Sequence, residues 1–103
     1  MKRRIVWTRA ALDDFKAQIA YIAAENPAAA QRVADMIKDS ASALSEIPIG
    51  RPGRVSGTYE KSVTRLPYVI AYAITVSGAG ESVAIIRVIH TARDWPDEQW
   101  PKT

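Results

Sequence analysis

The sequence predicts an α+β fold in which a short N-terminal strand and an antiparallel helical hairpin precede a three-stranded antiparallel meander. Apolar residues recur at helical spacing through the first half of the chain, and three β-rich runs with short connections fill most of the second half. The 103 residues suit a single domain over residues 1–103. Its core must be held by packing alone, because the chain has no cysteine for a disulfide or a thiolate metal site.

The N-terminal segment predicts a strand that leads directly into a helix. Ile5-Val6-Trp7 is a short β-rich run, and Thr8 is a suitable N-cap because its hydroxyl can accept from a free amide of the first turn. We expect the helix to run from about Arg9 to Glu25. We expect its buried side to be the stripe of apolar residues spaced three, four and three apart, namely Leu12, Phe15, Ile19 and Ile22.

A second helix follows after a very short connection. Asn26 is a good N-cap and Pro27 is tolerated at a first helical position, so the sequence predicts an antiparallel helical hairpin. The second helix should extend to about Glu46, before Pro48 and Gly50 stop it. Its predicted buried stripe consists of Val33, Ile37, Ala41 and Leu44.

The second half of the chain predicts an irregular loop and then the meander. Three glycines and a proline fall within residues 50–57, which indicates a loop. Strands are expected at about residues 58–66, 68–76 and 82–91, and their tight connections make them antiparallel. Strict alternation along the last strand would place Val83, Ile85, Arg87 and Ile89 on one face, and Ala84, Ile86, Val88 and His90 on the other.

Arg87 interrupts the apolar face of the last predicted strand. Two interpretations stay open from the residue type alone. Its guanidinium could reach the margin of the sheet or pair with a carboxylate such as Glu60, or it could be a positive group held on a concave sheet surface. His90 is more often a strand-end histidine bonded to backbone than a catalyst. Trp95 and Trp100 are more often packing groups than ligand-stacking ones.

Composition narrows the classes of function. Fourteen Lys and Arg against eleven Asp and Glu give a formal net charge of +3 and a pI near 9.4, which favours acidic partners but is modest for a dedicated nucleic-acid binder. With no cysteine and one histidine, we expect neither a metal site nor a cofactor. No apolar stretch approaches the roughly 20 residues that span a bilayer, and no signal-peptide pattern is present. We therefore expect no membrane association and a cytoplasmic location.

Two motifs lie at strand ends of the predicted meander. In the first, a Pro-Tyr pair opens the central strand, within Arg65-Leu66-Pro67-Tyr68-Val69-Ile70-Ala71-Tyr72. In the second, His-x-x-Arg-Asp-Trp-Pro closes the last strand, within Ile86-Arg87-Val88-Ile89-His90-Thr91-Ala92-Arg93-Asp94-Trp95-Pro96. Together with the order of the elements, these motifs resemble the RelE/ParE superfamily of bacterial toxins, and most of all its ParE branch. The resemblance covers nearly the whole chain and implies the RelE/ParE-like fold.

The resemblance implies the toxin of a type II toxin–antitoxin module, held inactive by a cognate ParD-like antitoxin in a hetero-oligomer. The C-terminal segment of the antitoxin would wrap the helices and the sheet edge, and a basic sheet face would favour its acidic residues. Operator DNA would be contacted only through the antitoxin. Any single apolar residue of this surface could instead belong to the core. The predicted antitoxin-binding residues are Phe15, Tyr21, Ile22, Met36, Ile37, Leu44, Ile47 and Arg54.

Members of the superfamily divide into two activities. ParE-like members resemble DNA gyrase inhibitors that act by binding, which implies a target-binding set of Arg65, Arg87, His90, Arg93, Asp94 and Trp95. RelE-like members resemble ribosome-dependent messenger-RNA endonucleases, for which the catalytic set would be Glu60, Arg65, Arg87 and His90. The sequence has no lysine-rich patch before the meander beyond Lys61 and no tyrosine in residues 91–103, which favours the non-enzymatic toxin. A third interpretation is an inactive interaction module.

Overall fold

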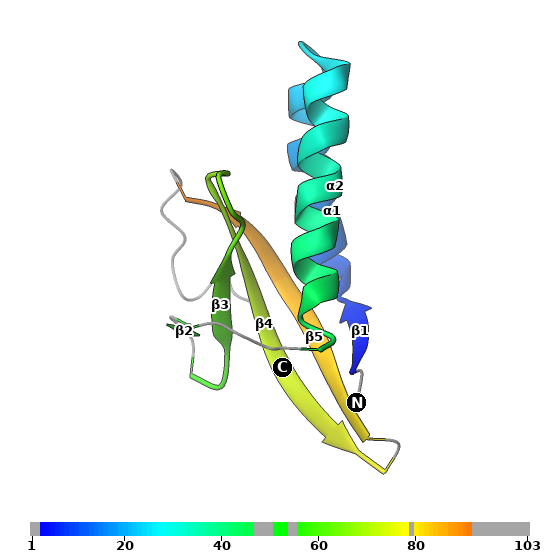
Figure 1. The fold of residues 1–103 in the computed structure, drawn as a ribbon, viewed down its shortest axis with the longest axis vertical. Helices are drawn as coiled ribbons and strands as arrows, with labels where there is room; N and C mark the ends of the chain where they lie inside the picture. Colours follow the sequence, from blue (N-terminus) through cyan, green and yellow to red (C-terminus); the bar gives the residue numbers. More distant parts are fainter. Residues whose placement is uncertain (1–2, 47–50, 54–55, 79, 92–103) are drawn as a thin grey trace.

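The structure, a computed structural model, describes residues 3–46, 51–53, 56–78 and 80–91. Figure 1 shows a helical hairpin beside a twisted sheet, which confirms the predicted α+β class. Within the described ranges, no helix is long and apolar enough to cross a membrane. The elements in chain order are β1 (Arg4–Trp7), α1 (Arg9–Ala23), α2 (Pro27–Ala43), β2 (Arg51–Pro52), β3 (Tyr59–Ser62), β4 (Tyr68–Ser77) and β5 (Gly80–His90).

The strands form one five-stranded sheet in the order β1-β5-β4-β3-β2. β1 is parallel to β5, and the other neighbouring pairs are antiparallel, so the meander of β3, β4 and β5 is confirmed. The prediction of an irregular loop was wrong at Arg51 and Pro52, which pair with Glu60 and Tyr59. Proline fits there because the strand lies at the edge of the sheet, where a missing amide breaks no ladder.

The two helices begin where the sequence predicted. The hydroxyl of Thr8 accepts from the amide of Ala11 at 3.1 Å, and the side chain of Asn26 accepts from the amide of Ala29 at 3.0 Å. Both helices end slightly earlier than expected, at Ala23 and Ala43, because the backbone after each helix forms a turn. In Figure 1 the tip of the helical hairpin extends past the end of the sheet.

α2 packs on the sheet through its predicted stripe. Ile37, Ala41 and Leu44 are essentially fully buried. They join one apolar cluster with the strand residues Val63, Tyr68, Ile70, Tyr72, Val83, Ile85 and Val88. We call the side of the sheet that carries this cluster the helix face. The opposite side, the outer face, carries a separate smaller cluster of Ala71, Ala73, Ile86 and Ile89.

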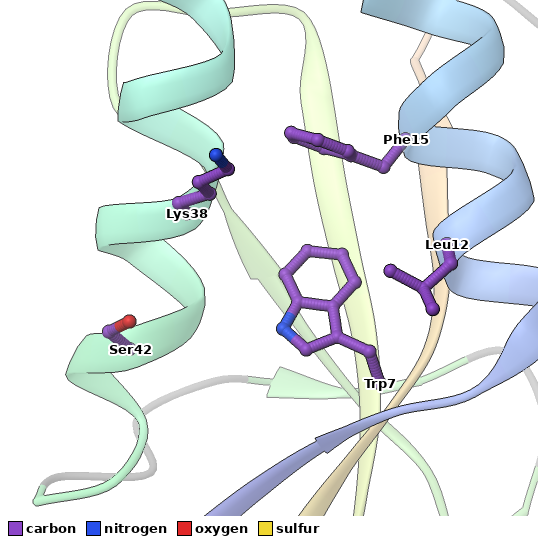
Figure 2. Close-up of a pocket in the computed structure, with 5 residues that line it drawn as sticks. All are labelled: Trp7, Leu12, Phe15, Lys38 and Ser42. Carbon is purple, nitrogen blue, oxygen red and sulfur yellow. The ribbon is translucent and has the colours of Figure 1, made fainter.

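α1 presents a different side to the core than the sequence predicted. Its buried residues are Ala11 and Gln18, whereas Leu12 is 37% exposed and Phe15 is only partly buried. The expectation that Leu12 lies on the buried side was therefore wrong. Ala11 allows α1 to approach β5 closely, and Leu12 and Phe15 point instead into the space between the two helices (Figure 2).

A bulge in β5 decides which of its residues share a face. Tyr72 of β4 pairs with Ile85, but Ala71 pairs with Arg87, so Ile86 is an extra residue in β5. The predicted grouping of Val83, Ile85, Arg87 and Ile89 on one face was therefore wrong. Alternation with a period of two holds only in a regular strand, and one inserted residue moves Arg87 to the outer face.

The Tyr72 hydroxyl is a buried oxygen with no hydrogen bond among the described residues. The side chain is fully buried, and its ring stacks on Tyr59 with the ring centroids 5.6 Å apart. Burial, and to a smaller extent the nearby Tyr59, raise the pKa of Tyr72 above its usual value of 10.0. A buried hydroxyl without a partner costs about 1–3 kcal/mol of stability.

We expect Tyr72→Phe to raise the free energy of unfolding by about 1 kcal/mol, because it removes this oxygen and keeps the ring. Urea unfolding measures the change, and Tyr59→Phe, on a half-exposed ring, should alter it by less than about 0.5 kcal/mol. The advantage of Tyr72→Phe should grow above pH 10.0, where the unfolded tyrosine ionises before the folded one and the wild type loses stability. A less stable Tyr72→Phe variant would contradict this account.

Candidate functional site

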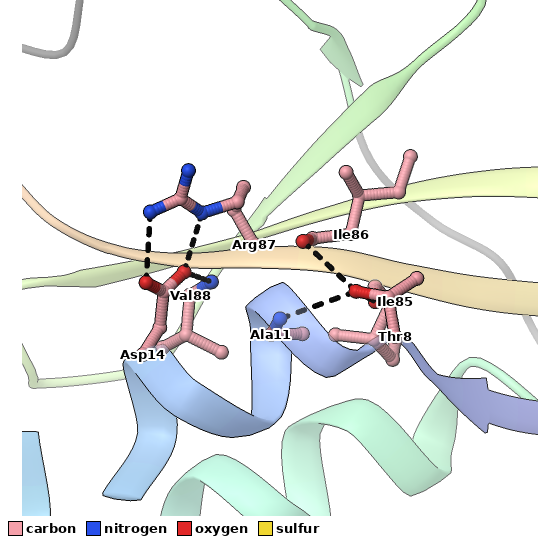
Figure 3. Close-up of polar contacts among 7 residues, drawn as sticks. All are labelled: Thr8, Ala11, Asp14, Ile85, Ile86, Arg87 and Val88. Atoms are coloured by element: carbon pink, nitrogen blue, oxygen red, sulfur yellow. Dashed lines mark hydrogen bonds and ion pairs between the residues drawn. The ribbon is translucent and has the colours of Figure 1, made fainter. Parts of the chain in front are cut away.

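An ion pair between Arg87 of β5 and Asp14 of α1 joins the sheet to the helical hairpin (Figure 3). Nε of Arg87 donates to Oδ2 of Asp14 at 2.7 Å, and Nη2 donates to Oδ1 at 2.8 Å. Oδ2 also accepts from the backbone amide of Val88 at 3.0 Å. The two charged side chains are only 13% and 10% exposed, so water screens this bidentate pair weakly.

Thr8 contacts β5 just before Arg87 in the sequence. Its hydroxyl is shared between the backbone oxygens of Ile85, at 2.9 Å, and Ile86, at 3.1 Å. The pairing of β1 with β5 ends at Ile85. Thr8 and Asp14 therefore bind backbone polar groups at the edge of β5 beyond the point where its pairing with β1 ends. These contacts hold the bulge in place.

A row of charged residues crosses the outer face of the sheet. Glu60 pairs with Ala71, and Ala71 pairs with Arg87, so the three side chains lie on one face of neighbouring strands. Arg51 is opposite Glu60 on β2, with Nη2 of Arg51 3.5 Å from Oε1 of Glu60. Glu60 is buried, whereas the Arg51 side chain is 57% exposed.

His90 lies on the other face of the sheet. It pairs with Tyr68 across β4 and β5, and the two rings meet edge to face with centroids 5.2 Å apart. Tyr68 belongs to the apolar cluster of the helix face. The structure thus separates His90 from Glu60 and Arg87.

An apolar groove of about 360 Å³ lies between the two helices (Figure 2). Trp7 lies at its floor, and its ring meets that of Phe15 edge to face at 5.6 Å. Leu12 lines the α1 side, while Lys38 and Ser42 line the α2 side. Nζ of Lys38 lies 5.7 Å from the Phe15 ring centroid, so one cation stands beside an otherwise apolar surface.

Comparison with known proteins decides the family. The family model described as the ParE toxin of the type II toxin-antitoxin system parDE matches residues 5–95. The chain belongs to the ParE toxin family. It is therefore the toxin of a type II toxin–antitoxin system, and the resemblance found in the sequence is confirmed.

Two curated relatives of the chain are also toxins by name. "Putative toxin Y4kP" of Sinorhizobium fredii is 38% identical over 96 residues, which cover 92% of this chain and 95% of that protein. "Toxin RelE2" of Caulobacter vibrioides is 40% identical over 91 residues, with 87% of this chain and 97% of that protein covered.

Solved structures match the fold of this ParE-family toxin. A chain of the chromosomal ParDE TA system from P. aeruginosa superposes with a TM-score of 0.77 at 22% identity, covering 86% of this chain and 96% of that one. The YoeB/ParE toxin from Agrobacterium tumefaciens gives a TM-score of 0.59 at 17% identity, with coverages of 84% and 97%. At these identities the likeness concerns the fold.

Three of the predicted target-binding residues of the ParE-family toxin lie among the described residues, and they are not together: Arg87 is on the outer face, His90 on the helix face and Arg65 in a turn. Arg65 is exposed in the turn before β4, with a left-handed backbone at φ 66°. The amide of Thr91 donates to the oxygen of Pro67 at 2.8 Å, which brings the end of β5 beside that turn. Arg93, Asp94 and Trp95, the rest of the predicted set, lie outside the described residues, as do Ile47 and Arg54 of the antitoxin set.

The predicted antitoxin-binding residues fall into two groups. Ile37 and Leu44 are fully buried in the core, so they offer no surface to a partner in this structure. Phe15, Ile22 and Met36 are partly buried, and Tyr21 is 81% exposed.

Sequence reasoning missed several residues of these surfaces. Trp7, Leu12, Lys38 and Ser42 of the groove were not among the predicted contacts, nor was Asp14. Asp14 lies three residues after Ala11 on the buried side of α1 that also carries Gln18, a side that the apolar pattern of the sequence does not mark. Within the described residues, no group of three or more His, Cys, Asp or Glu side chains could hold a metal ion.

Proposed function

We propose that this toxin inhibits DNA gyrase by binding, traps it on cleaved DNA and is neutralised by a cognate ParD-like antitoxin in the cytoplasm. The separation of the candidate ribonuclease residues carries this proposal. A ribonuclease needs a base, an acid and cations within reach of one phosphate. Here Glu60 and Arg87 share the outer face, whereas His90 packs on Tyr68 at the helix face. That arrangement favours binding over phosphoryl chemistry.

The proposed target-binding surface is the C-terminal string Arg93, Asp94 and Trp95 together with Arg65. The hydrogen bond from Thr91 to Pro67 supports this grouping, because it holds Thr91, two residues before the string, beside the turn that carries Arg65. The residue types suit a protein interface, where arginine and tryptophan often dominate the binding energy.

Gyrase supercoiling and DNA-cleavage assays with purified toxin test the proposal, with messenger cleavage on programmed ribosomes run in parallel. We expect loss of supercoiling or trapped cleaved DNA, with intact messenger. Arg93→Ala and Trp95→Ala should each weaken inhibition by at least about tenfold while the protein stays folded. Full inhibition by both variants would show that the string is not the gyrase contact.

A ribosome-dependent endonuclease is the second candidate. The buried carboxylate of Glu60 on the same face as Arg87 favours it, since these residues could still supply a base and a cation. Cleaved messenger with unaffected gyrase in the same assays would establish this activity. Glu60→Gln would then be the first catalytic variant to test.

We propose that the groove between the helices receives the antitoxin. Its aromatic floor suits apolar side chains from an amphipathic segment, and Lys38 beside it favours an acidic residue in that segment. Leu12 is the exposed apolar residue at the edge of this groove, so a partner would bury it. The proposed contact set is Trp7, Leu12, Phe15 and Lys38, in place of the buried Ile37 and Leu44.

We expect Leu12→Asp to weaken antitoxin binding by at least about a hundredfold, because it places a carboxylate in an apolar contact. Toxicity without antitoxin should be retained. Ala20→Asp is the matched control, since it adds the same charge on an exposed position of α1 away from the groove. Calorimetric titration of each variant with the cognate antitoxin measures the effect. Equal affinities for both variants would place the antitoxin elsewhere.

A further inference from the structure

We propose that the turn between β3 and β4 holds Arg65 in a fixed position for contact with a carboxylate on the target protein. This inference rests on the proposed function in taking Arg65 as part of the target-binding surface. Arg65 is exposed, and its side chain forms no hydrogen bond or ion pair within the described part of the chain. Its guanidinium is therefore available to a partner.

The backbone of Arg65 adopts a conformation that arginine rarely takes. Its φ of 66° is the only positive φ of a non-glycine residue in the described ranges. The amide of Leu66 donates to the oxygen of Val63 at 3.1 Å, and this bond closes a turn. The centre of the turn is formed by Thr64 and Arg65. A positive φ at the third residue of such a turn favours glycine or asparagine, because a Cβ atom crowds the backbone there. An arginine kept at a strained position indicates a use for its side chain.

Both sides of the turn are fixed, so the backbone of Arg65 cannot relax on its own. Val63 is 2% exposed and belongs to the main apolar cluster, and Leu66 packs against that cluster. The amide of Val63 donates to the oxygen of Tyr68 at 2.9 Å, which joins the start of the turn to β4. Pro67 restricts Leu66 further, because the residue before a proline favours extended conformations. These contacts fix the direction in which the Arg65 side chain leaves the turn.

A carboxylate is the group that this arrangement favours. A guanidinium on a fixed backbone can donate two parallel hydrogen bonds to a carboxylate, and less freedom is lost on binding. Binding along DNA phosphates needs several cations that act together, whereas the net charge of the whole chain is only +3. In Figure 1 the turn lies beside the end of β5, from which the rest of the proposed surface follows in sequence. Arg65 therefore suits an acidic residue of the target protein.

Three substitutions separate the strained backbone from the contact. Arg65→Gly relieves the strain and removes the guanidinium. Arg65→Lys keeps the strain and the charge but lacks the paired donors of the guanidinium. Thr64→Gly is the matched control for stability, since Thr64 is the exposed neighbour in the same turn and its φ is not positive. Each purified variant is assayed for its melting temperature, its affinity for gyrase without DNA, and the concentration that halves supercoiling.

We expect Arg65→Gly to raise the melting temperature by at least about 2 °C. Thr64→Gly should lower it, because glycine there adds freedom to the unfolded chain and relieves no strain. Arg65→Gly should nevertheless weaken both gyrase binding and inhibition by at least about tenfold. Arg65→Lys should stay at least about threefold weaker than wild type, because lysine lacks the planar fork of donors. A residue that only shapes the turn would not separate stability from binding in this way.

Two results would overturn the inference directly. One is wild-type gyrase binding and inhibition by Arg65→Gly, and the other is a lower melting temperature for that variant, since the turn would then not be strained. Loss of inhibition with unchanged binding to DNA-free gyrase would assign Arg65 to a DNA phosphate and exclude the carboxylate contact.

The test distinguishes failure of this inference from failure of the proposed target. If the wild-type toxin leaves gyrase unaffected, the gyrase proposal fails. The same variants are then ranked by growth inhibition after expression without antitoxin. Arg65 keeps its assigned role only if Arg65→Gly melts at a higher temperature than wild type and is less toxic.

Discussion

Arg87→Ala should lower the free energy of unfolding by about 3–5 kcal/mol, because it leaves the Asp14 carboxylate nearly buried without its cation. A domain of this size is stable by only about 5–15 kcal/mol, so a large part of its stability would be lost. Urea denaturation followed by circular dichroism measures the change. Toxicity assays of this variant must therefore be corrected for the folded fraction.

A double variant separates the unpaired charge from lost packing. Asp14→Asn with Arg87→Met keeps an acceptor for the Val88 amide and an unbranched apolar side chain at position 87. It should recover at least half of the stability lost in Arg87→Ala, because no buried charge remains. If Arg87→Ala alone costs less than about 1 kcal/mol, the pair is as well hydrated as a surface salt bridge and this account is wrong.

Local signals in the sequence were sufficient for the class of fold and for the order of its elements other than the short edge strand β2. Thr8 and Asn26 predicted both helix starts, because capping depends on residues a few positions apart. The turn before Tyr68 and the glycines near the tip of the next hairpin predicted the meander. The buried stripe of α2 followed from spacing alone, since one side of that helix meets one face of the sheet.

The charged contacts were beyond local reasoning. Asp14 and Arg87 are 73 residues apart in sequence, and nothing in either neighbourhood specifies the other. The bulge at Ile86 has no residue signature in an apolar run, so strict alternation gave the wrong face for Arg87. From the sequence, pairing of Arg87 with a carboxylate was one of two open interpretations, with Glu60 as an example. The structure adds Asp14 as the bidentate partner of Arg87.

The groove was missed for a related reason. The apolar stripe of α1 was predicted to be buried because an amphipathic helix normally turns that side to the core. Ala11 and Asp14 face the sheet edge instead. Leu12 and Phe15 therefore lie between the helices, with Trp7 beneath them. An apolar stripe in a sequence therefore marks a surface to be covered, and a partner can cover it as well as the core can.

Ile37→Ala should lower the free energy of unfolding by about 2–5 kcal/mol, because the side chain is fully buried in the main cluster and its loss leaves a cavity. Met36→Ala, one position earlier and only partly buried, should cost distinctly less. Urea unfolding compares the two variants. Their antitoxin affinities, measured on the folded protein, provide a second comparison.

The two measurements together decide whether α2 contributes Ile37 to the core or to the antitoxin interface. A core residue changes stability and leaves the affinity of the folded toxin close to wild type, whereas a contact residue changes affinity directly. We expect the first result, because α2 holds to the sheet through Ile37, Ala41 and Leu44. Strong loss of affinity with little loss of stability would mean that α2 turns this side to the antitoxin, and that the helical hairpin rearranges on binding.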